Sequence, residues 1–240
     1  MTKKLSFIHC ADLHLDSPFK GLHSVSTTLF KEIRNSTFDA LDNLVKLAIK
    51  KQVDFLLIVG DLFDQEQQSL IAQTKLRQAF DELHQHEIQV YVSYGNHDYL
   101  EGRLFDYTYP ENVHVFTKEQ VADFIYYKDG TPLVTISGFS YQKRAVNENK
   151  VAEYPKRANT PYHIGMLHGS LHTNTDHDVY APFQVSDLVE KNYDYWALGH
   201  IHKRQVLKEN PTIVYPGNIQ GRSKKETGEK GVYYVELTEQ

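Results

Sequence analysis

Three apolar segments, each ending in a short polar cluster, alternate with two stretches of helical periodicity between residues 5 and 99. The segments read LSFIHCADLHLD (5–16), VDFLLIVGDLFD (53–64) and IQVYVSYGNHDY (88–99). Between them, apolar residues recur at the helical period over about 27–51 and 67–86. Strands and helices that alternate in this way form βαβ crossovers, so a parallel sheet is predicted.

The polar clusters follow the carboxyl ends of the predicted strands. Parallel sheets bind their ligands beyond these ends, because the ends of neighbouring strands meet at one edge. We therefore expect Asp12, Asp61 and Asn96 to lie on one rim of the sheet.

The rest of the chain is richer in short strand-like segments separated by Gly, Pro, Asn or Asp. They read NVHVF, DFIYY, LVTISGF, YHIGMLHG, YDYWALGHIH, TIVYPGN and GVYYVEL. A short helix is expected near 185–190, and a long polar connection covers 140–161. No domain boundary is evident. The predicted fold class is α/β, with one two-sheet sandwich flanked by helices across residues 1–240.

Composition limits the chemistry of any site. Cys10 is the only cysteine in 240 residues, which excludes intrachain disulfides and thiolate metal clusters. The 13 histidines supply the commonest metal ligand. The net charge of -5 disfavours a broad electrostatic grip on nucleic acid, although two bound divalent cations would offset most of it. The sequence shows no secretory signal and no membrane-spanning run, so a cytoplasmic protein without membrane association is expected.

Polar residues that end apolar strands form a selective set: Asp12, His14, Asp61, Asn96, His97, His168, His200 and His202. Each cluster alone has an ordinary structural explanation. Asp12 can cap a turn, GNHD can form a hairpin turn, and the two histidines of GHIH can lie on an exposed strand face. Five such clusters at strand ends are better explained together, as ligands. Oxygen and imidazole groups without thiolates suit manganese, iron or zinc.

These clusters resemble the motif series of the calcineurin-like metallophosphoesterases. The motifs are Asp12-x-His14, Gly60-Asp61, Gly95-Asn96-His97-Asp98, His168-Gly169 and Gly199-His200-Ile201-His202. The resemblance spans nearly the whole chain and implies a four-layer αββα fold. Within the superfamily, ADLHLDSPF, GDLFD, SYGNHD, MLHGS, LGHIH and YPGNIQGRS are most similar to the SbcD-type and YhaO-like DNA repair exonucleases.

The resemblance implies a site for two divalent metal ions, with Mn²⁺ expected and Fe²⁺ or Zn²⁺ as alternatives. One ion would be held by Asp12, His14, Asp61 and His202, and the other by Asp61, Asn96, His168 and His200. Asp61 would bridge them. Two such ions lower the pKa of a bridging water, which becomes the nucleophile. His97 would stand beside the leaving group as a catalytic acid.

Three assignments stay open at this point. Asp98 has either a catalytic role, orienting His97 or a metal ligand, or a loop-capping role. His168 competes with His172 and His177 in HGSLHTNTDHD, and the motif favours His168. Asp64 stands where a histidine is expected in some nucleases of this type, which puts DNA contacts at that position in doubt.

The implied reaction is phosphodiester hydrolysis, and the expected function is that of a DNA repair exonuclease or endonuclease. The alternative is a phosphodiesterase or phosphatase acting on a nucleotide or another small molecule. A non-catalytic scaffold ranks last, because no ligand of the motif series is missing. Basic residues near the rim favour DNA, although loop charges are often only solvated surface: Lys143, Arg144, Lys156, Arg157, Arg222, Lys224 and Lys225.

Nucleases that resemble this chain usually continue into a DNA-capping region and a segment that docks an ATPase. We expect neither region within residues 1–240. An SbcC-like ATPase partner and a homodimer follow only by analogy with the family.

Overall fold

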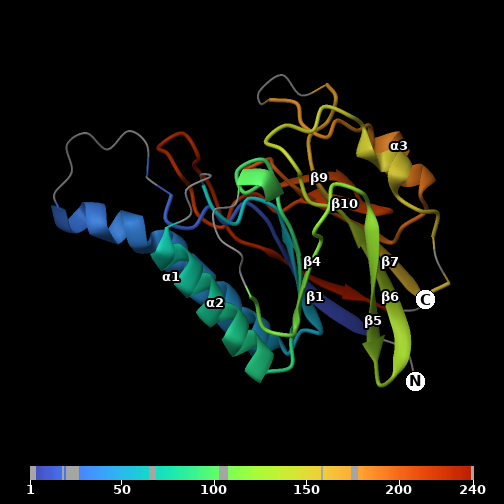
Figure 1. Cartoon of the computed structure of the whole chain (residues 1–240), viewed down its shortest axis with the longest axis horizontal. Coiled ribbons are helices and arrows are strands. Elements are labelled where there is room, and N and C mark those ends of the chain that lie inside the picture. Colours follow the sequence, from blue (N-terminus) through green and yellow to red (C-terminus); the bar gives the residue numbers. More distant parts are fainter. Residues whose placement is uncertain are drawn as a thin grey trace.

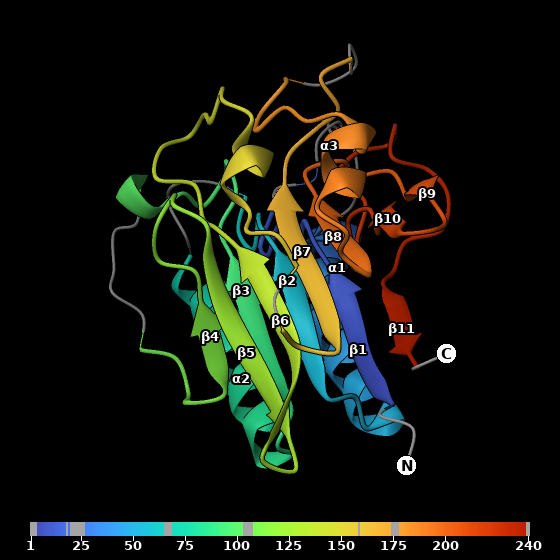
Figure 2. The ribbon, with the colours of Figure 1, turned by 90° about the vertical axis from the view of Figure 1, so that its right-hand side faces the viewer.

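Two β-sheets pack face to face, with helices on the outer faces, in the computed structural model of the chain (Figure 1). The structure describes residues 4–17, 19, 27–64, 69–102, 108–157, 159–173 and 178–238. Two helices cover the first sheet and a shorter helix lies against the second (Figure 2). The predicted α/β sandwich with flanking helices is confirmed.

The first sheet has the strand order β11-β1-β2-β3-β4. Its strands are β1 (Leu5–Cys10), β2 (Phe55–Val59), β3 (Gln89–Ser93), β4 (Val113–Val115) and β11 (Tyr233–Leu237). Strands β1 to β4 are parallel, and β11 pairs antiparallel with β1. The helices α1 (Thr27–Lys51) and α2 (Leu70–Gln85) connect β1 to β2 and β2 to β3. The predicted βαβ crossovers are therefore present.

The second sheet has the order β5-β6-β7-β8-β10-β9. Its strands are β5 (Ala122–Lys128), β6 (Thr131–Gly138), β7 (Tyr162–His168), β8 (Tyr195–Gly199), β9 (Gln205–Lys208) and β10 (Thr212–Tyr215). The four central strands are parallel, and β5 and β9 are antiparallel edges. Strand β9 was not predicted, because this short edge strand is only partly buried and has no apolar run.

Short helical elements complete the outer face of the second sheet. The helix α3 (Val185–Glu190) lies where it was expected. Two 3₁₀ turns, η1 (Leu100–Gly102) and η2 (Lys150–Glu153), lie in connections, and η2 lies within the long polar connection. In the described ranges, no helix is both long and apolar enough to cross a membrane.

Alternation along β2 shows how the layers are built. Leu56 and Ile58 pack with α1 and α2, whereas Phe55, Leu57 and Val59 pack between the sheets. All five side chains are buried, and burying each contributes about 1.5–3 kcal/mol. Both faces of this strand are therefore covered, as a continuous apolar run predicts.

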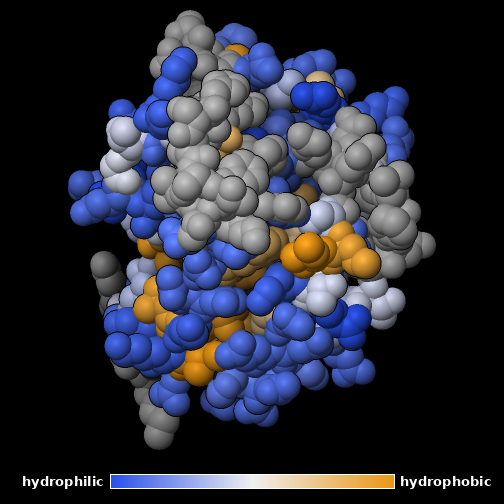
Figure 3. Space-filling view, turned by 90° about the vertical axis from the view of Figure 1, so that its left-hand side faces the viewer, coloured by the Kyte–Doolittle hydropathy of each residue, from blue (hydrophilic) through white to orange (hydrophobic). Residues whose placement is uncertain are grey.

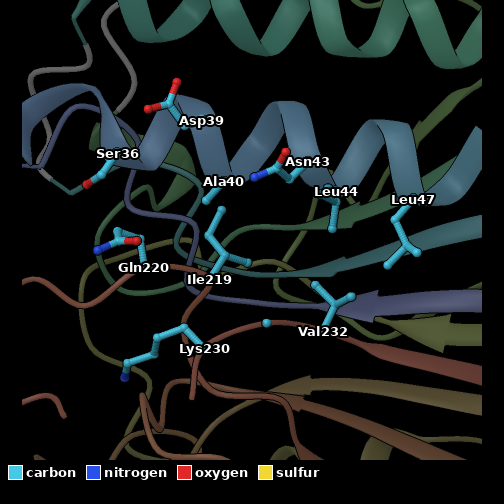
Figure 4. A pocket seen from close by; sticks show the side chains of 11 residues that line it. Ser36, Asp39, Ala40, Asn43, Leu44, Leu47, Ile219, Gln220, Lys230 and Val232 are labelled. Carbon is cyan, nitrogen blue, oxygen red and sulfur yellow. The ribbon is translucent and has the colours of Figure 1, made fainter. Parts of the chain in front are cut away.

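A pocket of about 400 Å³ lies between α1 and the chain segment 219–232 (Figure 4). Leu44, Leu47, Ile219 and Val232 form its apolar part, and Asp39, Asn43 and Lys230 are among its polar residues. None of the candidate metal ligands lines it. The surrounding helical face is largely hydrophilic, with scattered apolar patches (Figure 3).

Candidate metal centre

The loops that follow β1, β2, β3, β7 and β8 meet at one edge of the sandwich. The amide of Asp12 donates to the carbonyl of Gly60 (3.1 Å), and the amide of His14 donates to that of Asp61 (3.0 Å). The amide of His97 donates to Asp61 Oδ1 (3.0 Å). These backbone contacts bring the polar clusters of the first three strands onto one rim, where the sequence predicted them.

The Asp61 carboxylate lies at the centre of the cluster and is buried. Its Oδ2 atom is 3.5 Å from His168 Nε2 and 3.8 Å from His14 Nε2. These two histidines belong to different groups of donor atoms. A carboxylate oxygen between two such groups has the arrangement required of a bridging ligand.

The first group consists of Asp12, His14 and His202, whose donor atoms lie within 4.8 Å of one another. His14 Nε2 and His202 Nε2 are 3.0 Å apart, and Asp12 Oδ1 is 4.0 and 3.9 Å from them. Asp12 and His14 are buried. The second group consists of Asn96, His168 and His200: Asn96 Oδ1 lies 3.1 Å from His168 Nε2 and 3.2 Å from His200 Nδ1.

Hydrogen bonds fix which nitrogen of two histidines faces the cluster. His168 Nδ1 lies 2.9 Å from the carbonyl oxygen of Val59. A carbonyl only accepts, so Nδ1 carries a proton and Nε2 is the nitrogen that faces Asp61 and Asn96. Although burial favours the neutral ring, the Asp61 carboxylate raises the pKa of His168 to about 9, and a bound cation would take the place of the Nε2 proton. His202 Nδ1 donates in the same way to Glu226 Oε1 (2.9 Å), which leaves Nε2 toward His14. Such outer partners orient metal-binding histidines.

Glu226 was not predicted from the sequence. It lies in SKKETGEKG, a polar segment in which no local pattern distinguishes it from Glu229. Its carboxylate accepts from His202 Nδ1, from Asn218 Nδ2 (2.7 Å) and from the amide of Arg222 (2.8 Å). Burial opposes ionisation of Glu226, but these hydrogen bonds prevail and hold its pKa at about 2.

Four of the candidate ligands have left-handed backbone conformations: φ is 53° at Asp12, 42° at His14, 54° at Asp61 and 95° at His200. This region is unfavourable for residues other than glycine and costs on the order of 1 kcal/mol or more at each position. Strain of this kind concentrates at functional sites, because there the side-chain direction matters more than backbone stability.

Asp98 is buried and binds backbone rather than the His97 ring. Its Oδ1 accepts from the amides of Gly95 (2.7 Å) and Asp61 (3.3 Å), and its Oδ2 accepts from that of Leu62 (2.7 Å). Burial and the nearby Asp61 charge raise the pKa of Asp98 to about 7. Of the two roles left open by the sequence, these contacts favour loop capping, which makes Asp98 a positioning residue.

His97 lies at the more exposed edge of the site, with 28% of its side chain accessible. Its Nδ1 donates to the main-chain carbonyl of Asp64, and its ring meets the His14 ring edge to face at 5.1 Å. The Nδ1 proton is thus assigned, and Nε2 is the atom that can exchange a proton with a ligand.

The remaining candidates from the sequence differ in whether they lie near the donor groups. His172 is exposed in a turn and belongs to none of the donor groups found among the described residues. His177 lies outside the described residues. Among the seven basic residues near the rim, all within the described ranges, Arg222 is the one that contacts the cluster, through Nη1 at 3.4 Å from His14 Nε2. Arg157 instead binds Asp194 (2.9 Å).

The donor set fits divalent cations. It offers carboxylate, amide and imidazole groups without thiolate, which is the chemistry of manganese, iron or zinc sites. Burial opposes ionisation of Asp12 and raises its pKa. His14 Nδ1 is buried without a hydrogen-bond partner in the described ranges. Two buried carboxylates close to each other are costly without positive charge nearby, and divalent cations between these groups would offset that cost.

Comparisons with known proteins agree with this architecture. Residues 5–204 match the family model described as calcineurin-like phosphoesterase. The metallophosphoesterase YhaO of Bacillus subtilis is 48% identical over 239 residues, which cover 99% of this chain and 59% of that protein. The DNA double-strand break repair protein Mre11 of Thermoplasma acidophilum is 26% identical over 251 residues, covering 96% of this chain and 62% of that protein.

A solved structure shares the fold. TT1561 of Thermus thermophilus matches with a TM-score of 0.51 at 12% identity, over 90% of each chain. The chain spans less than two thirds of the length of the two curated relatives, so the similarity covers only the matched part of each. The family match nevertheless covers most of the chain. The protein therefore belongs to the calcineurin-like phosphoesterase family, whose members use divalent metal ions to hydrolyse phosphoesters.

Proposed function

We propose that this chain is a two-metal phosphodiesterase that hydrolyses DNA. The observation that supports the metal assignment best is the convergence of two donor groups on Asp61 Oδ2. One ion would be held by Asp12, His14, Asp61 and His202, and the other by Asp61, Asn96, His168 and His200. Manganese suits this donor set, as do iron(II) and zinc.

Bound ions would neutralise phosphoryl charge and lower the pKa of water at the site. The protein's own groups do the remaining work. His168 and His202 are held by Val59 and Glu226, so their ligating nitrogens need no rearrangement. His97 protonates the leaving oxygen from Nε2, and Asp98 fixes the loops that carry Asp61 and Gly95.

The DNA substrate is supported by the similarity to Mre11 proteins, which are named for DNA double-strand break repair. At 26% identity this similarity concerns the substrate class and leaves the direction of cleavage open. The resemblance of the motifs to SbcD-type nucleases is the ground for proposing an SbcC-like ATPase partner and a catalytic role for residues 1–240 beside it.

The first experiment compares bis(p-nitrophenyl) phosphate with p-nitrophenyl phosphate as substrates. Metal-stripped protein is supplied with manganese, Asp61→Ala serves as the blank, and Asp81→Ala, a change on the exposed face of α2, is the matched control. We expect diester hydrolysis to exceed monoester hydrolysis, and Asp61→Ala to lose both activity and bound manganese.

The outcomes separate the alternatives. A preference for the monoester would replace the nuclease by a small-molecule phosphatase. Two manganese equivalents retained by Asp61→Ala would contradict the bridging role. Diester preference leads to the second experiment, in which end-labelled duplex DNA replaces the chromogenic diester.

A further inference from the structure

Arg222 is tied to the candidate metal centre by its side chain and by its backbone. The side chain is 10% exposed. Nε donates to Ser17 Oγ (3.0 Å), and Nη2 forms an ion pair with Asp64 Oδ1. The hydroxyl of Ser17 in turn donates to Asp64 Oδ2 (3.0 Å). Both oxygens of the Asp64 carboxylate therefore help to hold one guanidinium group.

The same supports also touch the histidines of the centre. Asp64 Oδ1 is 3.6 Å from His14 Nδ1 and 3.7 Å from His97 Nδ1. The amide of Arg222 donates to Glu226, which binds His202. The position of the guanidinium is thus coupled to that of two candidate ligands and of the proposed acid.

The positive charge of the Arg222 guanidinium indicates that its ligand is an anion. Nη1 lies 3.4 Å from His14 Nε2, the nitrogen that faces the first donor group. Arginine has no lone pair for a metal ion and stays protonated, so it cannot be a ligand. A cation held next to two divalent cations is unfavourable unless an anion joins them. A phosphate group is the anion that a guanidinium recognises best, through paired N–H donors.

Donor groups remain for such an anion. A guanidinium has five N–H groups, and three of them have partners in the described part of the chain: Ser17, Asp64 and His14. A metal ion on His14 Nε2 would occupy that lone pair and release a further N–H. Partly exposed side chains at this edge include His97 (28%), His202 (19%) and Arg222 (10%). A phosphoester would enter past these three residues.

We propose that Arg222 binds a non-bridging phosphate oxygen of the substrate, and that Asp64 and Ser17 hold its guanidinium in position. Arg222 would then be a catalytic residue that touches the substrate, and Asp64 a positioning residue. This also explains the aspartate at position 64, where the family resemblance leads one to expect histidine. The inference deepens the proposed function, on which it rests.

The test measures binding of inorganic phosphate to the manganese-loaded chain by titration calorimetry. Arg222→Met removes the guanidinium, and Arg222→Lys keeps a positive charge for Asp64. Arg204→Met is the matched control, because Arg204 is exposed and pairs only with the exposed Glu229 among the described residues. Elemental analysis checks that each variant still binds two manganese ions.

We expect Arg222→Met to weaken phosphate binding by about 10- to 100-fold, because a hydrogen bond to a charged group is lost. Arg222→Lys should weaken it less, and Arg204→Met by less than about twofold. With bis(p-nitrophenyl) phosphate, the loss in Arg222→Lys should include a raised KM, which a purely structural role would not produce.

Phosphate affinity unchanged within about twofold in both Arg222 variants would overturn the proposal. Loss of a manganese equivalent from both would overturn it as well, because the arginine would then act on His14 rather than on the substrate. If Arg222→Met unfolds because Asp64 loses its cation, the phosphate affinity of Arg222→Lys alone decides whether the proposal holds. Failure of the wild-type chain to hydrolyse any diester would count against the proposed function alone, since phosphate binding is measured without turnover.

Discussion

At the scale of single residues, the hydrogen-bond partner on one ring nitrogen decides what the other nitrogen can do. Acceptors at Nδ1, namely the carbonyls of Val59 and Asp64 and the carboxylate of Glu226, make Nε2 the nitrogen that His168, His97 and His202 present. The roles proposed for these histidines differ because of what Nε2 faces, which is Asp61 at His168 and the more exposed edge of the site at His97.

His97→Ala tests the role of the acid. Its ring belongs to neither group that converges on Asp61, so we expect both manganese ions to stay bound while kcat falls by about 10²- to 10⁴-fold. Elemental analysis and steady-state kinetics measure the two quantities. A lost metal equivalent would show that His97 is a ligand.

Glu226→Gln tests the outer support of His202. Removing the charge of a carboxylate behind a metal-binding histidine typically lowers metal affinity by about 10- to 100-fold. We expect that loss at one of the two sites, measured by manganese titration. Glu229→Gln is the control, because Glu229 lies three residues away and its side chain is 85% exposed. Equal behaviour of the two variants would remove Glu226 from the centre.

At the scale of elements, the site depends on how closely the loops after the strands approach one another. The backbone of Gly95 does not require a glycine, since its φ is not in the left-handed region. A glycine is needed there because no side chain fits: a Cβ atom would lie 2.4 Å from Asp61 Oδ1 and 2.6 Å from His168 Nε2. The glycine therefore lets the β3 loop and the end of β7 pack against Asp61.

Gly95→Ala should displace His168 or Asp61. We expect about 1–3 kcal/mol of destabilisation and weakened manganese binding, read by urea unfolding and metal titration. Gly231→Ala, where a Cβ would meet nothing within 4 Å, should change neither. Normal metal binding by the Gly95 variant would mean that the loops can separate without cost.

Strand β1 also carries a histidine with a purely structural role. His9 Nε2 donates to the Leu198 carbonyl (3.0 Å), and Nδ1 accepts from the Tyr195 hydroxyl (2.9 Å). The neutral ring thereby joins the two sheets. Burial lowers the pKa of His9 to about 3, despite the carbonyl contact.

Because the unfolded chain binds this proton more readily, His9 lowers stability as the pH falls from about 6.5 toward 3. His9→Gln can replace both hydrogen bonds without titrating. Within that window, the wild type should lose up to about 1.4 kcal/mol per pH unit relative to the variant. Urea unfolding of both proteins at a series of pH values measures the difference, and parallel curves would contradict the prediction.

At the scale of the whole molecule, the centre joins the two sheets. Asp12, Asp61 and Asn96 follow strands of the first sheet, whereas His168, His200 and His202 end or follow strands of the second. Metal ions bound between these groups would link the layers in the folded state and find no preformed site in the unfolded chain.

Stripping the metal should therefore destabilise the whole sandwich. Manganese at about 100 times its Kd adds about 2.7 kcal/mol for one site, which corresponds to a rise in Tm of about 5–10 °C for a chain of this size. Calorimetry of chelator-treated and reloaded protein measures the shift. Asp61→Ala should show little of this rise in Tm on reloading, and an equal rise in that variant would locate the stabilising ions elsewhere.

The amino-acid sequence by itself determined the layers of the fold and the chemical types of the candidate ligands. Apolar periodicity reports which faces are buried, and polar residues at strand ends report the rim, since both are local patterns. The tertiary structure decided which nitrogen His168 and His202 turn toward the cluster, which amides Asp98 binds, and that Glu226 and Arg222 contact the candidate ligands. Arg222 and His14 are 208 residues apart, so no local pattern links them. Their contact exists because the chain between β10 and β11 passes the loop after β1, where Asn218 pairs with Ala11.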